Sequence, residues 1–480
     1  MNDCVILLRC AFPVLALLLA GCATDVPQVV TPQYRPETFT GPIDASAELW
    51  PKPDWWKTFG SDELSGLIAQ AESNNLDLAA AASRVLQADA QVTIQRSALF
   101  PQITGQAQAE RAGGSGGSIS SNGNSGSVSG TGNFFGLSLG ATYQLDFWGL
   151  ARDNLRSANE ALKSARFAQE VVALTTVAAV ANQYMNVLAL RRRIAIANEN
   201  IAAINAILDV IKLKVSAGAS SHLDLAQEEA QVESVEAQLP SLEEQELEAR
   251  YTLALLLGRP PEQFEVRARD LDSLAAPVVA PGLPSELLLR RPDVAQAEAN
   301  LAAAHANVDA ARAAFLPQIG LSADGGFASA ALNTLLHSSS FGWDIGANLL
   351  QTIFDGGRLA GQQDLAKATQ ELLIANYRQA VLGAYSDVET ALQQVAKNTT
   401  AKDHLVREVA AAREAFGIAR LQYEHGATDL LTVLQAQQTL FSAEDQLAQA
   451  TQARLQASVH LYEALGGGWS ESPGDRSQQF

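Results

Sequence analysis

Hydrophobic and polar residues alternate in four short segments, which predicts four β-strands. In the clearest of them, residues 135–147, seven apolar side chains alternate with six small or polar ones. Alternation also covers residues 102–112, 318–328 and 341–354. Each strand is about 11 residues long, the length that a tilted membrane strand needs. Between the first two strands, residues 113–132 are rich in Gly, Ser and Asn, which predicts a solvated loop.

Two proline-free segments predict unusually long helices. Residues 150–217 and 357–424 each span 68 positions, about 100 Å at the helical rise of 1.5 Å per residue. Gly218 and Gly426 follow them and are natural helix stops. Because the shorter helical segments are too short to match a long helix alone, we expect them to stack end to end beside it. These shorter segments are residues 77–99, 222–257, 293–314 and 429–465.

The chain contains an internal duplication. Gly218-Ala219-Ser220 recurs as Gly426-Ala427-Thr428, and Leu257-Gly258 recurs as Leu465-Gly466, both 208 residues later. A shared offset at two distant points indicates two repeats with elements of equal length. The expected organisation is a signal peptide (1–21), a lipidated extended segment (22–61), a first repeat (62–270), a second repeat (271–466) and a flexible tail (467–480).

The N-terminus predicts export and a lipid anchor. All three cysteines lie within the first 22 residues, and an apolar stretch leads to Leu19-Ala20-Gly21-Cys22. This sequence resembles the bacterial lipoprotein cleavage box, which implies lipidation of Cys22 and removal of residues 1–21. The absence of Asp directly after Cys22 favours the outer membrane. The alternative is an ordinary signal peptide that happens to contain a cysteine.

Composition and charge exclude several classes of function. The 83 alanines and the low aromatic content of 6% suit closely packed helices. A net charge of −19 argues against an electrostatic grip on nucleic acid. No apolar run of about 18 residues follows position 22, so we expect no helical membrane span. The six histidines lack metal-site spacing and no nucleophile or phosphate-binding motif occurs, so we expect neither an enzyme nor a cofactor.

The predicted strands require partners from other chains. Four strands cannot close a barrel, and each backbone group left unpaired in lipid costs several kcal/mol. Two copies give eight strands, too narrow for a channel, whereas three give the twelve strands that a pore needs. The alternative is a periplasmic or cell-surface coiled-coil rod capped by a four-stranded sheet. Five aromatic residues near strand ends favour the lipid-facing barrel of a homotrimer: Phe135, Tyr143, Phe147, Phe341 and Trp343.

Several motifs carry a resemblance to a known family. They are Asp-Trp-Trp-Lys-Thr-Phe at 54–59, Asn-Asn-Leu-Asp-Leu at 74–78, Gly-Leu-Pro-Ser-Glu-Leu-Leu-Leu-Arg-Arg-Pro-Asp-Val at 282–294 and the alanine-rich segment ending in Phe-Leu-Pro at 315–317. With these, about residues 12–469 resemble the TolC-like outer membrane factors, in the lipoprotein branch of the OprM and NodT type. The resemblance implies a mainly α fold in which long helical hairpins form a periplasmic α-barrel and three chains share a twelve-stranded β-barrel.

The same resemblance implies the function and the partners. Such a protein is the passive exit duct of a tripartite efflux system in the outer membrane, extending into the periplasm. A periplasmic adaptor links it to an inner-membrane RND-type transporter, which supplies the energy. Nothing in the sequence names the cargo or the particular adaptor and transporter.

The resemblance further implies a gate where the two helix-turn-helix bends meet at the periplasmic tip. In the family, a carboxylate in the first bend bonds a tyrosine before the second glycine. The matching residues are Asp224 and Tyr423. On the residues alone, Asp224 lies near a helix start, where a carboxylate complements the helix dipole.

A constriction is expected beside this pair. Leu431 matches the family's apolar constriction, but Thr432 and Gln435 stand where relatives carry carboxylates. The ion selectivity of the gate is therefore open. Asp429 is a possible substitute charge, although its position at a helix start also suits a cap.

The cleavage box leads to a direct test of the anchor. Cys22→Ala should abolish incorporation of labelled palmitate, because the acceptor thiol of the box is lost. The channel itself should still assemble, since strand closure rather than the lipid provides insertion. Unchanged labelling would contradict the lipoprotein prediction.

Overall fold

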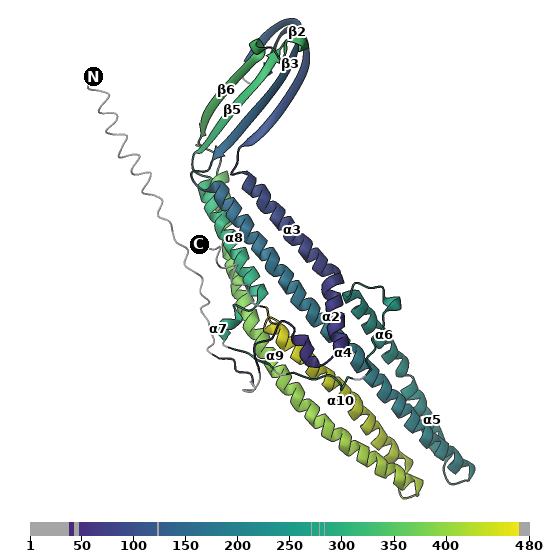
Figure 1. Cartoon of the computed structure of the whole chain (residues 1–480). Coiled ribbons are helices and arrows are strands. Elements are labelled where there is room, and N and C mark those ends of the chain that lie inside the picture. Colours follow the sequence, from purple (N-terminus) through teal and green to yellow (C-terminus); the bar gives the residue numbers. More distant parts are fainter. Residues whose placement is uncertain are drawn as a thin grey trace. The chain divides into compact units, whose positions relative to one another are not determined.

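A computed structural model describes residues 38–42, 48–121, 124–269, 271–277, 279–282 and 284–469. The predicted signal peptide, Cys22 and residues 470–480 of the predicted tail lie outside these ranges. The described chain is mainly helical and carries one four-stranded sheet (Figure 1).

Both long helices are present and equal in length. α4 (Leu150–Ser216) and α9 (Arg358–Glu424) each contain 67 residues, within one residue of the predicted bounds. α3 (Leu76–Ser97) contacts α4, and α8 (Pro292–Ala313) contacts both long helices. α10 (Leu430–Ala464) returns along α9. The predicted stacking of short helices along a long one is therefore confirmed in the second half (Figure 1).

The return helix of the first half differs from the expectation. Residues 222–257 form two helices, α5 (His222–Glu236) and α6 (Leu239–Leu256), both in contact with α4. The break lies at Ala237 and Gln238, just before Pro240 in the first turn of α6. Proline has no backbone N–H and its ring clashes with the preceding turn, so a continuous helix is interrupted there.

The four predicted strands form one antiparallel sheet in the order β2-β3-β5-β6. Chain connectivity places it where α3 and α8 end and where α4 and α9 begin (Figure 1). β2 and β6 are the edge strands, each paired on one side only within the described chain. The strands are β2 (Gln102–Ser121), β3 (Asn124–Leu145), β5 (Gln318–Ser329) and β6 (Phe341–Leu350).

Two strand boundaries correct the sequence prediction. The expected loop at 113–132 is wrong, because β2 and β3 remain paired as far as Ser121 opposite Asn124. Small residues supply the same backbone donors and acceptors as any others, so a hairpin already in register can continue through them. β6 ends at Leu350, four residues before the predicted end, and its apolar side chains, including Trp343 and Ile345, are largely exposed.

The remaining elements are short and lie mostly near the middle of the helical part. β1 (Glu48–Leu49) pairs in parallel with β4 (Val279–Ala280). The other short elements are η1 (Trp55–Phe59), α2 (Asp62–Asn74), η2 (Pro261–Gln263), α7 (Pro284–Leu287), η3 (Leu332–Thr334) and η4 (Ser338–Ser340). We did not expect η1 within the segment predicted to be extended.

The main core lies where the N-terminal elements meet the long helices. Trp55 is 1% exposed and stacks on Tyr462 of α10, with ring centroids 5.0 Å apart. Tyr184 of α4 is fully enclosed in the same cluster, and its hydroxyl lies 3.1 Å from the Ser61 Oγ. The motif Asp-Trp-Trp-Lys-Thr-Phe therefore joins both repeats through packing.

The Arg-Arg-Pro-Asp-Val motif begins α8. Pro292 occupies the first turn, where a missing N–H costs nothing. The Arg291 guanidinium makes two hydrogen bonds to the Asp293 carboxylate, at 3.0 and 2.7 Å, and lies 2.9 Å from Asp387 of α9. The motif is thus a helix start tied to the neighbouring long helix.

One helix departs from the expectation of no helical span. By length and apolar composition alone, α4 contains a window that could cross a membrane. Its residues Val180, Met185 and Leu188 are fully buried in the main core. Of the whole window, 33% is buried within the single chain, so α4 contributes one face to the core and leaves the rest uncovered.

The aromatic stack gives a prediction for the core. Trp55→Ala should lower the free energy of unfolding by about 3–5 kcal/mol, because it removes the large buried ring that packs on Tyr462. Thermal melting of the helical circular-dichroism signal in detergent measures the effect. Trp56→Ala, at the less buried neighbouring ring, is the control and should cost less; equal losses would contradict this account of the core.

Candidate functional site

The two bends at the ends of the long helices have the same backbone geometry. Gly218 and Gly426 adopt left-handed φ angles of 71° and 74°, which glycine adopts without strain. After each bend the chain closes the helix end in the same way. Ala219 N donates to the Lys214 carbonyl and Ala427 N to the Gln422 carbonyl, both at 2.8 Å. This match of the two bends at the offset of 208 supports the duplication.

The two bends contact each other, as expected for one tip. The Nζ of Lys214 on α4 donates to the carbonyl oxygen of Tyr423 on α9 at 2.7 Å and lies 3.9 Å from the centre of its ring. Apolar side chains from both hairpins surround this contact. This group, which we call the tip cluster, consists of Ile207, Ile211, Ala419, Tyr423, Leu430 and Val433, with Val215, Leu225, Phe416, Leu434 and Ala436 packed against it.

Asp224 makes its hydrogen bonds within the first bend. Its Oδ2 accepts hydrogen bonds from the Ser220 hydroxyl at 2.7 Å and from the Ser221 N–H at 2.9 Å. Its own N–H donates to the Ser221 Oγ, which completes a capping box at the start of α5. These hydrogen bonds, the one from Ser220 first, lower the pKa of Asp224.

The predicted hydrogen bond between Tyr423 and Asp224 is absent from the described arrangement. The Tyr423 hydroxyl is buried and has no hydrogen-bond partner among the described residues. Burial raises the pKa of this phenol, the nearby Ser220 hydroxyl lowers it, and the charges of Asp224 and Glu228 raise it. The hydrogen bonds from Ser220 and Ser221 hold the Asp224 carboxylate within its own bend through Oδ2.

The second bend has a similar cap. Asp429 accepts from the N–H of Thr432 at 2.9 Å and from its hydroxyl at 2.6 Å, so the capping reading of Asp429 is confirmed. These two bonds lower the pKa of Asp429. Leu431, Thr432 and Gln435 are exposed on the first turns of α10. They are free within one chain to line a constriction, and that role stays a prediction.

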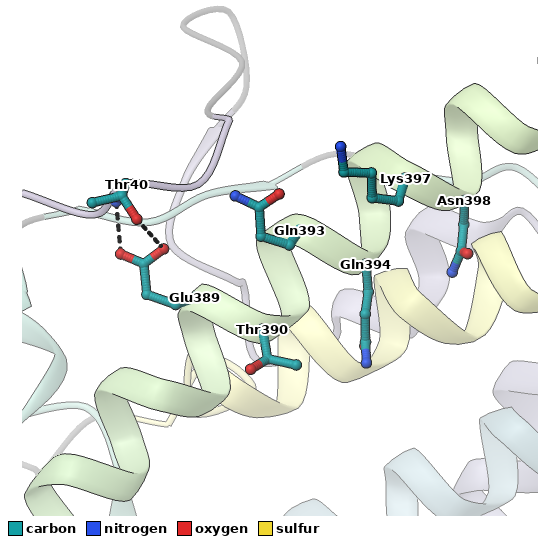
Figure 2. A pocket seen from close by; sticks show the side chains of 7 residues that line it. All are labelled: Thr40, Glu389, Thr390, Gln393, Gln394, Lys397 and Asn398. Carbon is teal, nitrogen blue, oxygen red and sulfur yellow. Dashed lines mark hydrogen bonds between the residues drawn. The ribbon is translucent and has the colours of Figure 1, made fainter.

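A polar groove of about 480 Å³ lies away from the tip, on α9 beside the N-terminal segment (Figure 2). Its carboxylate, Glu389, accepts hydrogen bonds from the Thr40 N–H at 2.6 Å, the Thr40 hydroxyl at 3.0 Å and the Gly41 N–H at 2.9 Å. Figure 2 shows Gln393 and Lys397 on the same side of the helix as Thr40. These hydrogen bonds to Glu389 attach the N-terminal segment around Thr40 to α9.

Comparison with known proteins identifies the family. The sequence matches the profile of the outer membrane efflux proteins over residues 67–259 and 283–467, one match for each repeat. The chain belongs to this family. The pyoverdine export outer membrane protein OpmQ of Pseudomonas putida is 38% identical over 467 residues, which cover 97% of this chain and 98% of the relative. OpmQ of Pseudomonas aeruginosa is 41% identical over 416 residues, 86% of this chain and 87% of the relative.

A solved structure agrees with the sequence matches. The outer-membrane channel OprN superposes with a TM-score of 0.83 at 29% identity, covering 92% of this chain and 99% of that one. The chain is therefore an outer-membrane efflux channel that extends into the periplasm. Its helical hairpins form the tunnel, and its four strands belong to a twelve-stranded barrel shared by three chains. The alternative of a structural coiled-coil rod is not supported, because the relatives are transport channels.

Sequence reasoning missed two tip residues. Lys214 joins the hairpins, but a lysine near a helix end gives no distinct signal. Glu228 is fully buried on α5. The spacing of Leu225, Glu228, Val232 and Val235, at three, four and three residues, could have placed this carboxyl on the apolar face.

The capping box leads to a prediction for the first bend. Asp224→Ala should destabilise the start of α5 by about 1 kcal/mol, because the cap and its bond to Ser221 are lost. Amide exchange at the first turn of α5 should speed up about fivefold to tenfold. Ser221→Ala should do the same, and Glu229→Ala, an exposed substitution on the same helix, should not. Unchanged exchange in both cap variants would contradict this role.

Proposed function

We propose that this channel works with a periplasmic adaptor and an RND-type inner-membrane transporter, and that its tunnel is closed at the tip formed by the two bends. The channel is passive and performs no catalysis of its own. A lipid on Cys22 is proposed as a second attachment to the outer membrane, in addition to the barrel.

The observation that best supports a docking role is the exposure of leucines near both bends. They have relative exposures of 55–71% although they lie beside a well-packed apolar cluster. Apolar side chains that a single chain leaves uncovered are suited to contacts with neighbouring copies and with a partner. The residues are Leu213 on α4, Leu223 on α5, Leu421 on α9 and Leu431 on α10.

Gating at the same place has independent support. The tip cluster and the contact between Lys214 and Tyr423 hold the two hairpins of a chain together. At this cluster the two hairpins are joined by apolar packing together with the hydrogen bond from Lys214 to the Tyr423 carbonyl. An adaptor that covers the exposed leucines can compete with this packing.

The cargo depends on the transporter that the channel joins. Two relatives that are 38% and 41% identical are named for pyoverdine export. We therefore propose a siderophore as the first cargo to test for this chain.

Site-specific photocrosslinking tests the proposed docking. A photoreactive residue at Leu223 should capture the co-expressed adaptor, because this side chain is exposed at the tip. The same residue at Leu86, equally exposed on α3 toward the other end of the helical part, should capture none. Loss of the adaptor product at Leu223 in an intact channel, or equal capture at both sites, would contradict the proposal.

A further inference from the structure

Glu228 lies on the buried face of α5, where the other side chains are apolar. The buried face of α5 carries Leu225, Glu228, Val232 and Val235. The two valines pack against Ile204 and Leu208 of α4, and Leu225 contacts both this group and the tip cluster. The carboxyl of Glu228 therefore lies between two apolar clusters.

This carboxyl is enclosed and has no partner. Glu228 is 0% exposed, and neither of its oxygens has a hydrogen-bond partner among the described residues. An ionised carboxylate in such a place loses its hydration and gains nothing in return. Burial accordingly raises the pKa of Glu228 from its ordinary value of 4.5 to about 7.

The groups around Glu228 do not offset this cost. On α9, the Tyr423 hydroxyl is buried and also without a partner in the described chain, and it lies close enough to respond to the charge of Glu228. On α4, Lys214 donates to the Tyr423 carbonyl, while Asp209 and Lys212 are exposed. On α5 itself, Asp224 is engaged in the capping box.

Comparison of the two repeats shows that packing at these two positions does not require the polar groups. At the offset of 208, Glu228 corresponds to Ala436 of α10, and Tyr423 corresponds to Val215 of α4. Ala436 and Val215 both pack against the tip cluster. Each of these two fold positions is therefore polar in one repeat and apolar in the other: Glu228 of the first repeat is matched by Ala436, and Tyr423 of the second repeat is matched by Val215.

We propose that Glu228 is a proton-controlled latch for the tip: the neutral acid lets α5 pack against α4 and α9, and its ionisation favours the open, hydrated tip. This inference rests on the proposed gate at the bends. It assigns the gate a carboxyl other than Asp224 and makes the opening of the duct depend on periplasmic pH.

The direction of the effect follows from linkage. In the closed tip the pKa of Glu228 is raised, so the closed state binds the proton more tightly than the open state. The closed tip is therefore most stable in acid and loses stability as pH rises from about 4.5 to about 7. Within that window, each pH unit shifts the ratio of open to closed tips by up to about tenfold per subunit.

Single-channel recording of the purified channel between pH 5 and pH 8 tests the latch. For the natural chain, the open probability should rise at least tenfold across this range, with a midpoint near 7. Glu228→Gln, a neutral side chain of the same size, should remove the rise and stay at the acid level. Glu229→Gln, on the exposed face of the same helix, should leave the rise unchanged.

Glu228→Ala adds a second check, since Ala436 shows that alanine fits the equivalent position. Between pH 5 and pH 8, the thermal stability of Glu228→Ala should change less than the thermal stability of the natural chain. A natural channel that conducts without a pH-dependent step, or a step that persists in Glu228→Gln, would overturn the latch while leaving the proposed duct intact. Absence of any conductance at all would instead count against the duct.

Discussion

The two unpaired edges of the four-stranded sheet constrain everything else in this molecule. β2 and β6 each present a row of backbone donors and acceptors that the described chain does not satisfy. Water can satisfy such groups, but lipid cannot, and each unpaired group there costs several kcal/mol. With ten or more residues on each edge, this cost far exceeds the stability of a typical folded domain. The edges must therefore pair between chains.

The helical part continues the arrangement that the sheet begins. Each strand hairpin is continued by a helix of 67 residues, so the two repeats carry matching elements away from the sheet. The main core ties these elements together midway, through the stack of Trp55 on Tyr462 and the ion pairs of Arg291. Beyond that core, the hairpins are held by small apolar clusters and a few polar contacts. The tip is thus held by smaller buried clusters than the middle of the helical part.

Much of this architecture could be predicted from the sequence, because the signals are long and periodic. The two long helices were predicted to within one residue, and the strand near residues 135–145 showed clear alternation. The continued pairing of residues 113–121 could not be predicted, because glycine and serine give no alternation and the register is set by neighbouring residues. The expected helix over 222–257 contains Pro240, and this proline is the sequence signal that could have located the break between α5 and α6.

The site was harder to predict than the fold. Asp224 was expected to bond Tyr423 of the other bend. Instead it accepts hydrogen bonds from Ser220 and Ser221, which are its near neighbours in the sequence. Local caps form within a few residues and therefore compete well with distant partners. Glu228 was overlooked because a single carboxylate in a polar-rich helix looks solvated. Its spacing from Leu225, Val232 and Val235 places it on the apolar face of α5, and the packing of α5 against α4 encloses it.

The trimeric barrel is the claim on which the tunnel, the gate and the partners all depend. Native mass spectrometry of the chain, purified from membranes in mild detergent, tests it most directly. We predict an assembly with the mass of three mature chains, whose β2 and β6 amides are protected from hydrogen exchange. A monomer with the same protected edge amides would contradict it.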